Sequence, residues 1–305
     1  MSYLIVGGTG FIGAYLAKKL VDENKKVVIY DYMPNKEVIS DIVEKVDLVQ
    51  GDIQHLGQII RTVKEYDVEY IINLAALLSR ESNKNPRMAI EINCLGADNV
   101  FQAALLNGVK RVVWASSDAV FGSGYEDIHF PLNENSPVMP DTVYGACKLF
   151  DECLGSLYNT EYAVDNVGLR FTFVYGAGRI RGVSYITNDL FVKPLMGTPV
   201  TIPYAKTTLD WLYVKDAVKA ILLAANAEKL EHKTFIISGE AKPVYEVAEY
   251  VKKLIPGAVF DLQPGDQGFL SSYDRSRARK ELGYEPSYSV EKGVEECIRT
   301  LRQTL

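Results

Sequence analysis

Short apolar runs alternate with helix-like patterns through the first half of the sequence, and this alternation constrains the fold more than any other feature. Strands are expected at residues 3–6, 27–30, 46–49, 70–72, 111–114 and 164–170. Amphipathic helical patterns are expected at 11–21, 86–106 and 142–158. Strands separated by helices in this way are typical of stacked strand–helix–strand units, so the pattern predicts an α/β fold.

The periodicity loosens beyond Tyr175, where glycine, proline and tyrosine become more frequent. We therefore expect residues 1–170 to form the main domain, with 206–240 returning to it. Residues 171–205 and 241–305 would form a smaller, substrate-binding lobe.

The composition is that of a soluble enzyme. The 305 residues carry a net charge of −6, and an acidic surface disfavours nucleic acid and anionic membranes as partners. The cysteines lack a Cys-x-x-Cys pair and the histidines lack metal-ligand spacing, so neither a disulfide framework nor a metal site is expected. No apolar run is long enough for a membrane helix, and the first strand begins too early for a signal peptide. We expect a cytoplasmic protein.

A glycine-rich turn separates the first strand from the first helix. It reads Gly7-Gly8-Thr9-Gly10-Phe11-Ile12-Gly13. Glycine permits a tight turn, Gly10 allows close approach to a pyrophosphate, and the helix start offers free N–H groups. Taken alone, the glycines fit a simple tight turn equally well, but the strand–helix context favours dinucleotide binding.

Asp31 ends the second strand, where an acid is expected to accept hydrogen bonds from both ribose hydroxyls and to repel a 2′-phosphate. This favours NAD over NADP, although a solvated turn aspartate would look the same. Asp52 follows the third strand and is placed either to meet the adenine or to cap the next helix.

Tyr144 and Lys148 lie one helical turn apart on one face of the expected helix at 142–158. A free tyrosine has a pKa of about 10, and a neighbouring lysine favours its phenolate form. Ser117, at the end of the fifth strand, is placed to hydrogen-bond a substrate oxygen. Tyrosine and lysine at this spacing are usually a surface pair, and Ser116 is a weaker alternative to Ser117 because adjacent strand residues face opposite ways.

The order of these motifs resembles the extended short-chain dehydrogenase/reductases, the NAD-dependent epimerase/dehydratase family. Further matching segments are Asn73-Leu74-Ala75-Ala76, Asn93-Cys94-Leu95-Gly96, Ser116 to Gly122, Leu169 to Gly176, Asp210 to Val214 and Asp274 to Pro286. The resemblance covers nearly the whole chain and keeps the family's order.

The resemblance implies a doubly wound parallel sheet, a small C-terminal substrate lobe and a homodimer built on the helices near 86–106 and 142–158. It implies Tyr144, Lys148 and Ser117 as catalytic residues. The NAD-binding residues would be Gly7, Gly10, Phe11, Ile12, Gly13, Asp31, Asp52, Ile53, Leu74, Ala75, Ala76, Asn93, Ser116, Tyr144 and Lys148.

Departures from the family's patterns narrow the reaction. Ala119 follows Asp118 where sugar 4,6-dehydratases have an Asp-Glu pair, so dehydration is disfavoured. Phe173 replaces an asparagine, and Leu209 an arginine, that many nucleotide-sugar epimerases carry. The segment ending at Ser79 resembles the threonine and hydroxy-acid dehydrogenases of the group. Candidate substrate residues are Ser79, Arg80, Asp118, Arg179 and Arg181.

Three functions stay open from the sequence. The first is net oxidation or reduction of a carbohydrate-like or hydroxy-acid substrate by exchangeable NAD. The second is a nucleotide-sugar (UDP-sugar) epimerase that keeps its NAD and shows no net redox. The third, an NAD-binding sensor without catalysis, is disfavoured because Tyr144 and Lys148 are both present.

Overall fold

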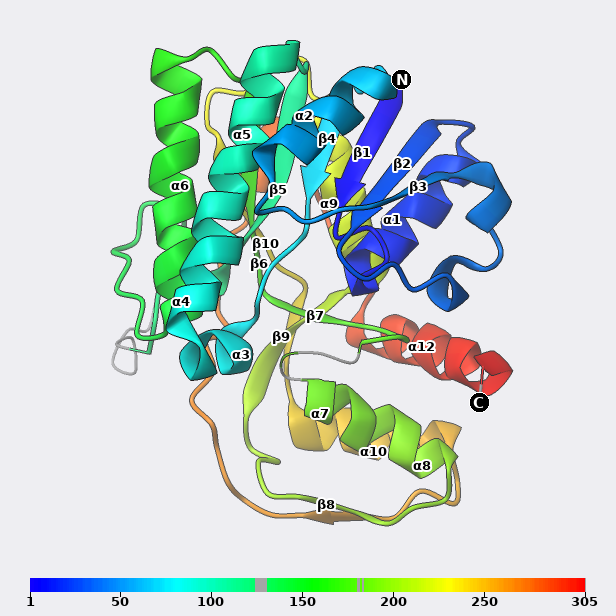
Figure 1. Ribbon diagram of the computed structural model, residues 1–305. Coiled ribbons are helices and arrows are strands. Elements are labelled where there is room, and N and C mark those ends of the chain that lie inside the picture. Colours follow the sequence, from blue (N-terminus) through cyan, green and yellow to red (C-terminus); the bar gives the residue numbers. More distant parts are fainter. Residues whose placement is uncertain (124–130, 180–181, 183, 305) are drawn as a thin grey trace.

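The central element is a seven-stranded sheet in the strand order β10-β6-β5-β4-β1-β2-β3 (Figure 1). The computed structural model describes residues 1–123, 131–179, 182 and 184–304. All neighbouring strands in this sheet pair in parallel. The strands are β1 (Ser2–Val6), β2 (Lys26–Asp31), β3 (Asp47–Gln50), β4 (Tyr70–Asn73), β5 (Arg111–Ser117), β6 (Asn166–Phe171) and β10 (Thr234–Ile237). The predicted doubly wound α/β fold is confirmed.

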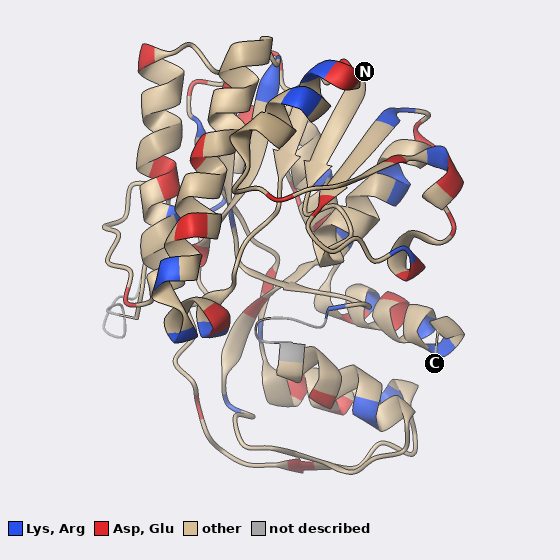
Figure 2. Ribbon diagram, in the orientation of Figure 1, with Lys and Arg blue, Asp and Glu red and all other residues tan. Residues whose placement is uncertain are grey.

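Helices cover both faces of the sheet, which is why the middle strands carry continuous apolar runs such as Tyr3–Val6 in β1 and Val112–Trp114 in β5. On one face α1 (Phe11–Asp22) packs beside α9 (Val214–Asn226). On the other, α2 (Leu56–Glu65) packs on α5 (Gly96–Asn107), and α5 on α6 (Val143–Glu161). Every residue of β1 is buried, and Figure 2 shows that charged residues concentrate on the helices and loops.

The helix predicted over 86–106 is interrupted. It consists of α4 (Pro86–Ala89), a π-helical segment η3 (Ile90–Leu95) and α5. Within η3 the side chains of Asn93 and Cys94 are buried. The Asn93 amide accepts a bond from the backbone N–H of Leu77 at 2.8 Å and donates to its carbonyl at 3.0 Å. The irregular turn therefore coincides with a side chain that fixes the loop after β4.

The smaller lobe contains two further sheets. One has the order β11 (Glu240–Pro243), β9 (Thr208–Tyr213), β7 (Phe173–Tyr175), and the other pairs β12 (Phe260–Leu262) with β8 (Val200–Ile202). Its helical segments are α7 (Ser184–Thr187), η5 (Asn188–Val192), α8 (Lys193–Leu195), α10 (Val244–Leu254), α11 (Ser276–Leu282) and α12 (Val290–Thr304). The short segments η1 (Glu37–Ile39), η2 (Val43–Lys45), α3 (Ser79–Lys84) and η4 (Asp118–Val120) lie in the main domain's loops.

The segment 206–240 divides between the two parts. Its helix α9 packs on β5 and β6, and its strand β10 joins the edge of the main sheet beside β6. Its first strand, β9, instead pairs with β7 and β11 in the second sheet. The expectation that 206–240 returns to the main sheet is therefore met by α9 and β10 and not by β9.

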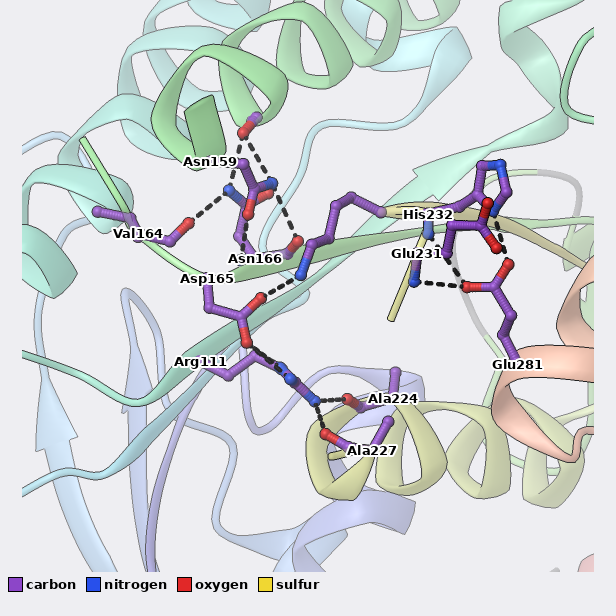
Figure 3. Close-up of polar contacts among 12 residues, drawn as sticks. Arg111, Asn159, Val164, Asp165, Asn166, Ala224, Ala227, Glu231, His232 and Glu281 are labelled. Carbon is purple, nitrogen blue, oxygen red and sulfur yellow. Dashed lines mark hydrogen bonds and ion pairs between the residues drawn. The ribbon is translucent and has the colours of Figure 1, made fainter. Parts of the chain in front are cut away.

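A polar cluster ties the amino-terminal end of the main sheet together (Figure 3). Asp165 accepts bonds from Arg111 at 2.7 Å and from Lys233 at 2.6 Å. The Arg111 guanidinium also donates to the carbonyls of Ala224 and Ala227 at the end of α9, where a cation is favoured by the helix dipole. In the described part of the chain, no helix is both long and apolar enough to span a membrane.

Candidate active site

A large cleft opens at the carboxyl ends of the central strands and extends to the smaller lobe. Its volume is about 2430 Å³, well above the roughly 300–1,000 Å³ typical of a site for one small ligand. Ligands of doubly wound folds bind at this edge of the sheet. This volume also includes space beside α1, α9 and α12, so only part of it lies at the strand ends.

The glycine turn forms the floor of the cleft between β1 and α1. Gly7 has a φ of 78°, and a Cβ there would lie 3.0 Å from the backbone nitrogen of Ala75. A Cβ on Gly13 would lie 2.5 Å from the carbonyl oxygen of Gly7. Gly10 begins α1 without a side-chain cap, and Gly10, Phe11, Ile12 and Gly13 of this first turn line the cleft. This arrangement fits a pyrophosphate.

Asp31 lies at the rim of the cleft beside this turn. Its carboxylate accepts hydrogen bonds from the Thr9 N–H at 3.0 Å, the Thr9 hydroxyl at 2.7 Å and the Met33 N–H at 3.2 Å. These bonds fix the carboxylate in the place where a ribose would meet the end of β2. Contact of Asp31 with the ribose of NAD stays a prediction.

The remaining predicted cofactor residues divide into two groups. Leu74 and Ala76 line the cleft, whereas Ala75 packs its backbone against Gly7. Asp52 and Ile53 are not part of the described lining. The Asp52 carboxylate accepts a bond from the Gln54 N–H at 2.9 Å, so it stabilises a turn; the N-cap of α2 is His55.

Ser116 and Asn93 are both buried by protein partners. The Ser116 hydroxyl donates to Glu152 at 2.6 Å, and Glu152 also forms a buried ion pair with Arg170 at 2.7 Å. Asn93 bonds the backbone of Leu77, as described above. Both side chains therefore support the walls of the cleft, and contact of either with NAD stays a prediction.

Tyr144, Lys148 and Ser117 come together in the cleft, as their spacing predicted. Helix α6 begins just before Tyr144, where the Thr142 hydroxyl caps the helix by accepting the Gly145 N–H at 3.0 Å. The Lys148 Nζ lies 5.8 Å from the centre of the Tyr144 ring. Ser117 ends β5, and its hydroxyl lies close enough to the phenol to lower the pKa of Tyr144. The three side chains thus converge from a strand end and a helix start.

The pKa of Tyr144 is raised above its ordinary value because burial disfavours the phenolate. Lys148 and the Ser117 hydroxyl both act in the opposite direction and lower it. The sequence correctly predicted the direction of the lysine's influence and did not predict the burial. A cation bound beside the phenol, such as an oxidised nicotinamide ring, would lower this pKa further.

Asp151 is a neighbour of the site that the sequence analysis missed. Its carboxylate lies 3.4 Å from the Lys148 Nζ, and both side chains are buried. Although burial alone would lower the pKa of Lys148, Asp151 and Tyr144 raise it overall. The i, i+3 spacing on α6 was the available signal, but a charged pair at that spacing normally faces solvent.

Four of the five predicted substrate residues line the cleft. They are Ser79, Arg80, Asp118 and Arg179. Arg181 lies outside the described residues. The Arg179 guanidinium stacks on Phe173 at 4.9 Å, and its Nε is buried with no hydrogen-bond partner in the described structure. Burial lowers the pKa of Arg179 to about 10, against the opposite influence of Tyr144 and Asp118.

Asp118 places in the cleft a carboxyl group whose pKa is raised. Burial raises its pKa to about 6, although hydrogen bonds from Tyr273 and Ser117 oppose the change. The Tyr273 hydroxyl donates to it at 2.9 Å and the Ser117 hydroxyl at 3.2 Å. Tyr273 comes from the smaller lobe and was not predicted. Asp118 therefore links Ser117 to the wall formed by that lobe.

One group of potential metal ligands occurs among the described residues, away from the cleft's glycine turn. Ligand atoms of Glu231, His232 and Glu281 lie within 4.8 Å of one another. Figure 3 shows His232 and Glu281 facing each other. Glu281 bonds the His232 ring at 2.6 Å and the backbone N–H groups of Glu231 and His232 at 3.0 Å. These contacts explain the cluster without an ion, and the absence of a metal stays a prediction.

Known proteins resemble this chain along its whole length. It is 28% identical to a putative UDP-glucose 4-epimerase of Methanocaldococcus jannaschii, covering 98% of each chain. It is 26% identical to a dTDP-4-dehydro-6-deoxyglucose reductase of Escherichia coli, covering 98% of this chain and 97% of that one.

Solved structures agree. A UDP-glucose 4-epimerase from Thermus thermophilus in complex with NAD superimposes with a TM-score of 0.86 at 25% identity, covering 100% of both chains. An L-threonine dehydrogenase from Cupriavidus necator does so with a TM-score of 0.88 at 25% identity, covering 99% of this chain and 100% of that one. The model of the NAD dependent epimerase/dehydratase family matches residues 3–238. The chain belongs to this family of NAD-dependent enzymes.

Proposed function

We propose that this enzyme catalyses net, NAD-dependent oxidation or reduction at a hydroxyl-bearing carbon of a small carbohydrate-like or hydroxy-acid substrate. The observation that carries the proposal is the convergence of Tyr144, Lys148 and Ser117 in the cleft whose floor is the glycine turn. The smaller lobe, residues 171–205 and 241–305, would bind the substrate against this edge.

The residues divide the chemistry as follows. The glycine turn and Asp31 would hold NAD, which would supply the hydride acceptor. Tyr144, as phenolate, accepts the proton of the substrate hydroxyl. Lys148 lowers the pKa of the phenol and would hold the nicotinamide ribose. Ser117 donates a hydrogen bond to the substrate oxygen as the carbonyl forms.

Two apolar side chains support net redox chemistry. Leu209 is 1% exposed and belongs to the main core. A leucine cannot bind a phosphate, which needs hydrogen-bond donors. The Phe173 ring packs edge-on against the Trp211 ring, with 5.2 Å between their centroids. The Arg179 guanidinium lies over the Phe173 ring. The alternative function is that of a nucleotide-sugar epimerase that retains its NAD. The epimerases among the similar proteins favour this alternative.

The fate of NAD separates these two functions. We would purify the protein, measure bound dinucleotide after gel filtration, and add candidate hydroxy acids and UDP-sugars with excess NAD+. A dehydrogenase is expected to lose its NAD and to produce NADH, read at 340 nm. Retained NAD with UDP-sugar conversion and no net NADH would establish the epimerase instead.

The catalytic role of Tyr144 is tested by Tyr144→Phe. We expect turnover to fall by a factor of about 10³ or more, because the general base is lost, while NAD affinity changes by less than about threefold. Ser123→Ala, which alters another hydroxyl of the cleft lining, serves as the matched control. Full turnover in the phenylalanine variant would remove Tyr144 from the mechanism. A protein that binds NAD and turns over no substrate would be the sensor of the third hypothesis.

We also propose a cytoplasmic homodimer. The segment η3 packs against α6, and both expose large apolar side chains: Ile90 is 51% exposed, Leu95 55%, Phe150 51% and Leu157 46%. Apolar side chains gathered on neighbouring elements mark interfaces. Light scattering is expected to give twice the chain mass, and Phe150→Glu is expected to give monomers. Met196→Glu, at an exposed site in the smaller lobe, should leave the dimer intact.

A further inference from the structure

A fully buried carboxylate lies directly behind the catalytic lysine. Asp151 is 1% exposed and Lys148 is 4% exposed. The Asp151 Oδ2 lies 3.4 Å from the Lys148 Nζ, and its Oδ1 has no hydrogen-bond partner in the described structure. A carboxylate placed this way is anchored by a single partner, so its charge state and that of Lys148 are closely linked.

The other ionisable groups around Asp151 do not balance the negative charge of its carboxylate. Cys94 faces it from η3, and Cys147 precedes Lys148 on α6. Burial raises the pKa of both thiols, so they are neutral at pH 7. Glu152 is also close, but it is held by Arg170. Lys148 is therefore the cation that balances Asp151 among these groups.

Asp151 acts on Tyr144 through this arrangement. Lys148 lowers the pKa of the phenol, whereas Asp151 raises it. Burial raises the pKa of Asp151 itself to about 6, against the influence of Lys148. Above that pH the carboxylate is ionised and offsets part of the lysine's charge.

We propose that Asp151 is a positioning residue, which anchors the Lys148 ammonium in the cleft and moderates its electrostatic effect on the Tyr144 phenol. This inference rests on the proposed function, because it assigns Asp151 a role in setting the pH at which the proposed base, Tyr144, forms its phenolate. Asp151 is not among the described residues that line the cleft. It acts through Lys148, so that the enzyme gains its phenolate at a higher pH than the lysine alone would set.

The test uses cofactor affinity and needs no substrate. NAD+ carries a positive nicotinamide ring that NADH lacks, so the ratio of their affinities rises as Tyr144 loses its proton. Isothermal titration between pH 6 and pH 10 gives this ratio and its midpoint. Tyr144→Phe is expected to abolish the rise, which assigns it to the phenol.

Asp151→Asn is expected to move the midpoint down by about one pH unit, since a nearby negative charge is removed. Glu161→Gln removes an exposed carboxylate from the same helix and should leave the midpoint unchanged. Asp151→Glu is expected to restore the charge and return the midpoint toward that of the parent. Asp151→Ser, which leaves room for water, replaces the asparagine variant if the latter does not fold.

The outcomes separate the two claims. A midpoint in Asp151→Asn within about 0.2 unit of the parent, together with a lowered melting temperature, would show a purely structural aspartate and overturn the inference. A rise that persists in Tyr144→Phe would instead overturn the proposed role of Tyr144. Loss of the rise in Tyr144→Phe with an unmoved midpoint in Asp151→Asn leaves the proposed function standing and removes Asp151 alone.

Discussion

At the scale of single residues, Gly13 shows how closely the cleft floor is packed. Its hypothetical Cβ would lie 2.5 Å from the Gly7 carbonyl oxygen and 2.8 Å from the Gly8 Cα. Both contacts are with backbone atoms, which cannot rotate away as a side-chain end can. The position therefore admits only glycine if the turn is to keep its shape.

Gly13→Ala is expected to weaken NAD binding at least tenfold and to lower the free energy of unfolding by about 1–3 kcal/mol, because the turn must open. Gly57→Ala is the control, since nothing lies within 4 Å of its hypothetical Cβ on α2. That variant should leave NAD affinity unchanged and stability equal or slightly higher. Calorimetric titration and urea unfolding measure both effects. Equal effects of the two substitutions would contradict the close contact at Gly13.

The residues predicted best were those whose position follows from local spacing. Tyr144 and Lys148 share a helix, and Ser117 ends a strand of a parallel sheet, so short-range patterns place them in one cleft. Tyr273 reaches Asp118 across 155 positions of sequence. No short-range sequence pattern predicts the contact between Tyr273 and Asp118, because it depends on how the smaller lobe packs against the main domain. Asp151 was missed because its burial depends on η3 packing against α6.

At the scale of elements, one buried ion pair joins α6 to the sheet. Glu152 on α6 bonds Arg170 on β6 at 2.7 Å, and the Ser116 hydroxyl of β5 at 2.6 Å. The Glu152 and Arg170 side chains are 9% and 6% exposed. This cluster holds the helix that carries Tyr144 in a fixed position over the strand that carries Ser117.

Glu152→Gln is expected to lower the free energy of unfolding by about 3 kcal/mol, because it leaves a buried guanidinium without its counter-charge. Glu249→Gln breaks an exposed pair with Lys252 and should change stability by less than about 1 kcal/mol. Urea unfolding curves at pH 7 give both values. If the two substitutions have equal effects, the pair does not anchor α6.

The elements themselves were easier to predict than their partners. The alternating pattern correctly located β1 to β6 of the main sheet and the helices α1 and α6, but it gave no strand at β10 and no helix at α2. The separate expectation that 206–240 returns to the main domain included β9, whereas Trp211 and its neighbours pair with β7 and β11. A strand pattern reports that one face is buried, and strand pairing is decided by contacts distant in sequence. The π-helical segment η3 likewise depends on Asn93 meeting Leu77.

At the scale of the whole molecule, Asp210 couples stability to pH. Its Oδ1 accepts the Thr172 hydroxyl at 2.6 Å and the Gly239 N–H at 2.7 Å. Burial raises the pKa of Asp210 from 3.8 to about 6, with these bonds acting against it. At Asp210 the folded protein therefore binds a proton more tightly than the unfolded chain does. The stabilisation that this proton gives the folded state is full below pH 3.8 and is lost as the pH rises through 6.

Asp210→Asn keeps an oxygen for both bonds and removes the charge. The variant is expected to become more stable than the parent between pH 4 and pH 7, with a difference that reaches about 2–3 kcal/mol. Asp22→Asn, at an exposed site at the end of α1, should show no such trend. Unfolding measured in urea across this pH range provides the comparison. A difference that does not grow with pH would contradict the assigned proton affinity.

The central claim is that a phenol, an ammonium and a hydroxyl act on a nicotinamide seated above the glycine turn. A crystal structure of the protein with NAD tests it most directly. The account predicts the pyrophosphate at the start of α1, the adenosine ribose on Asp31, the nicotinamide ribose on Lys148, and the ring's C4 facing the space beside the Tyr144 hydroxyl. A nicotinamide bound with C4 turned away from Tyr144 and Ser117 would contradict it.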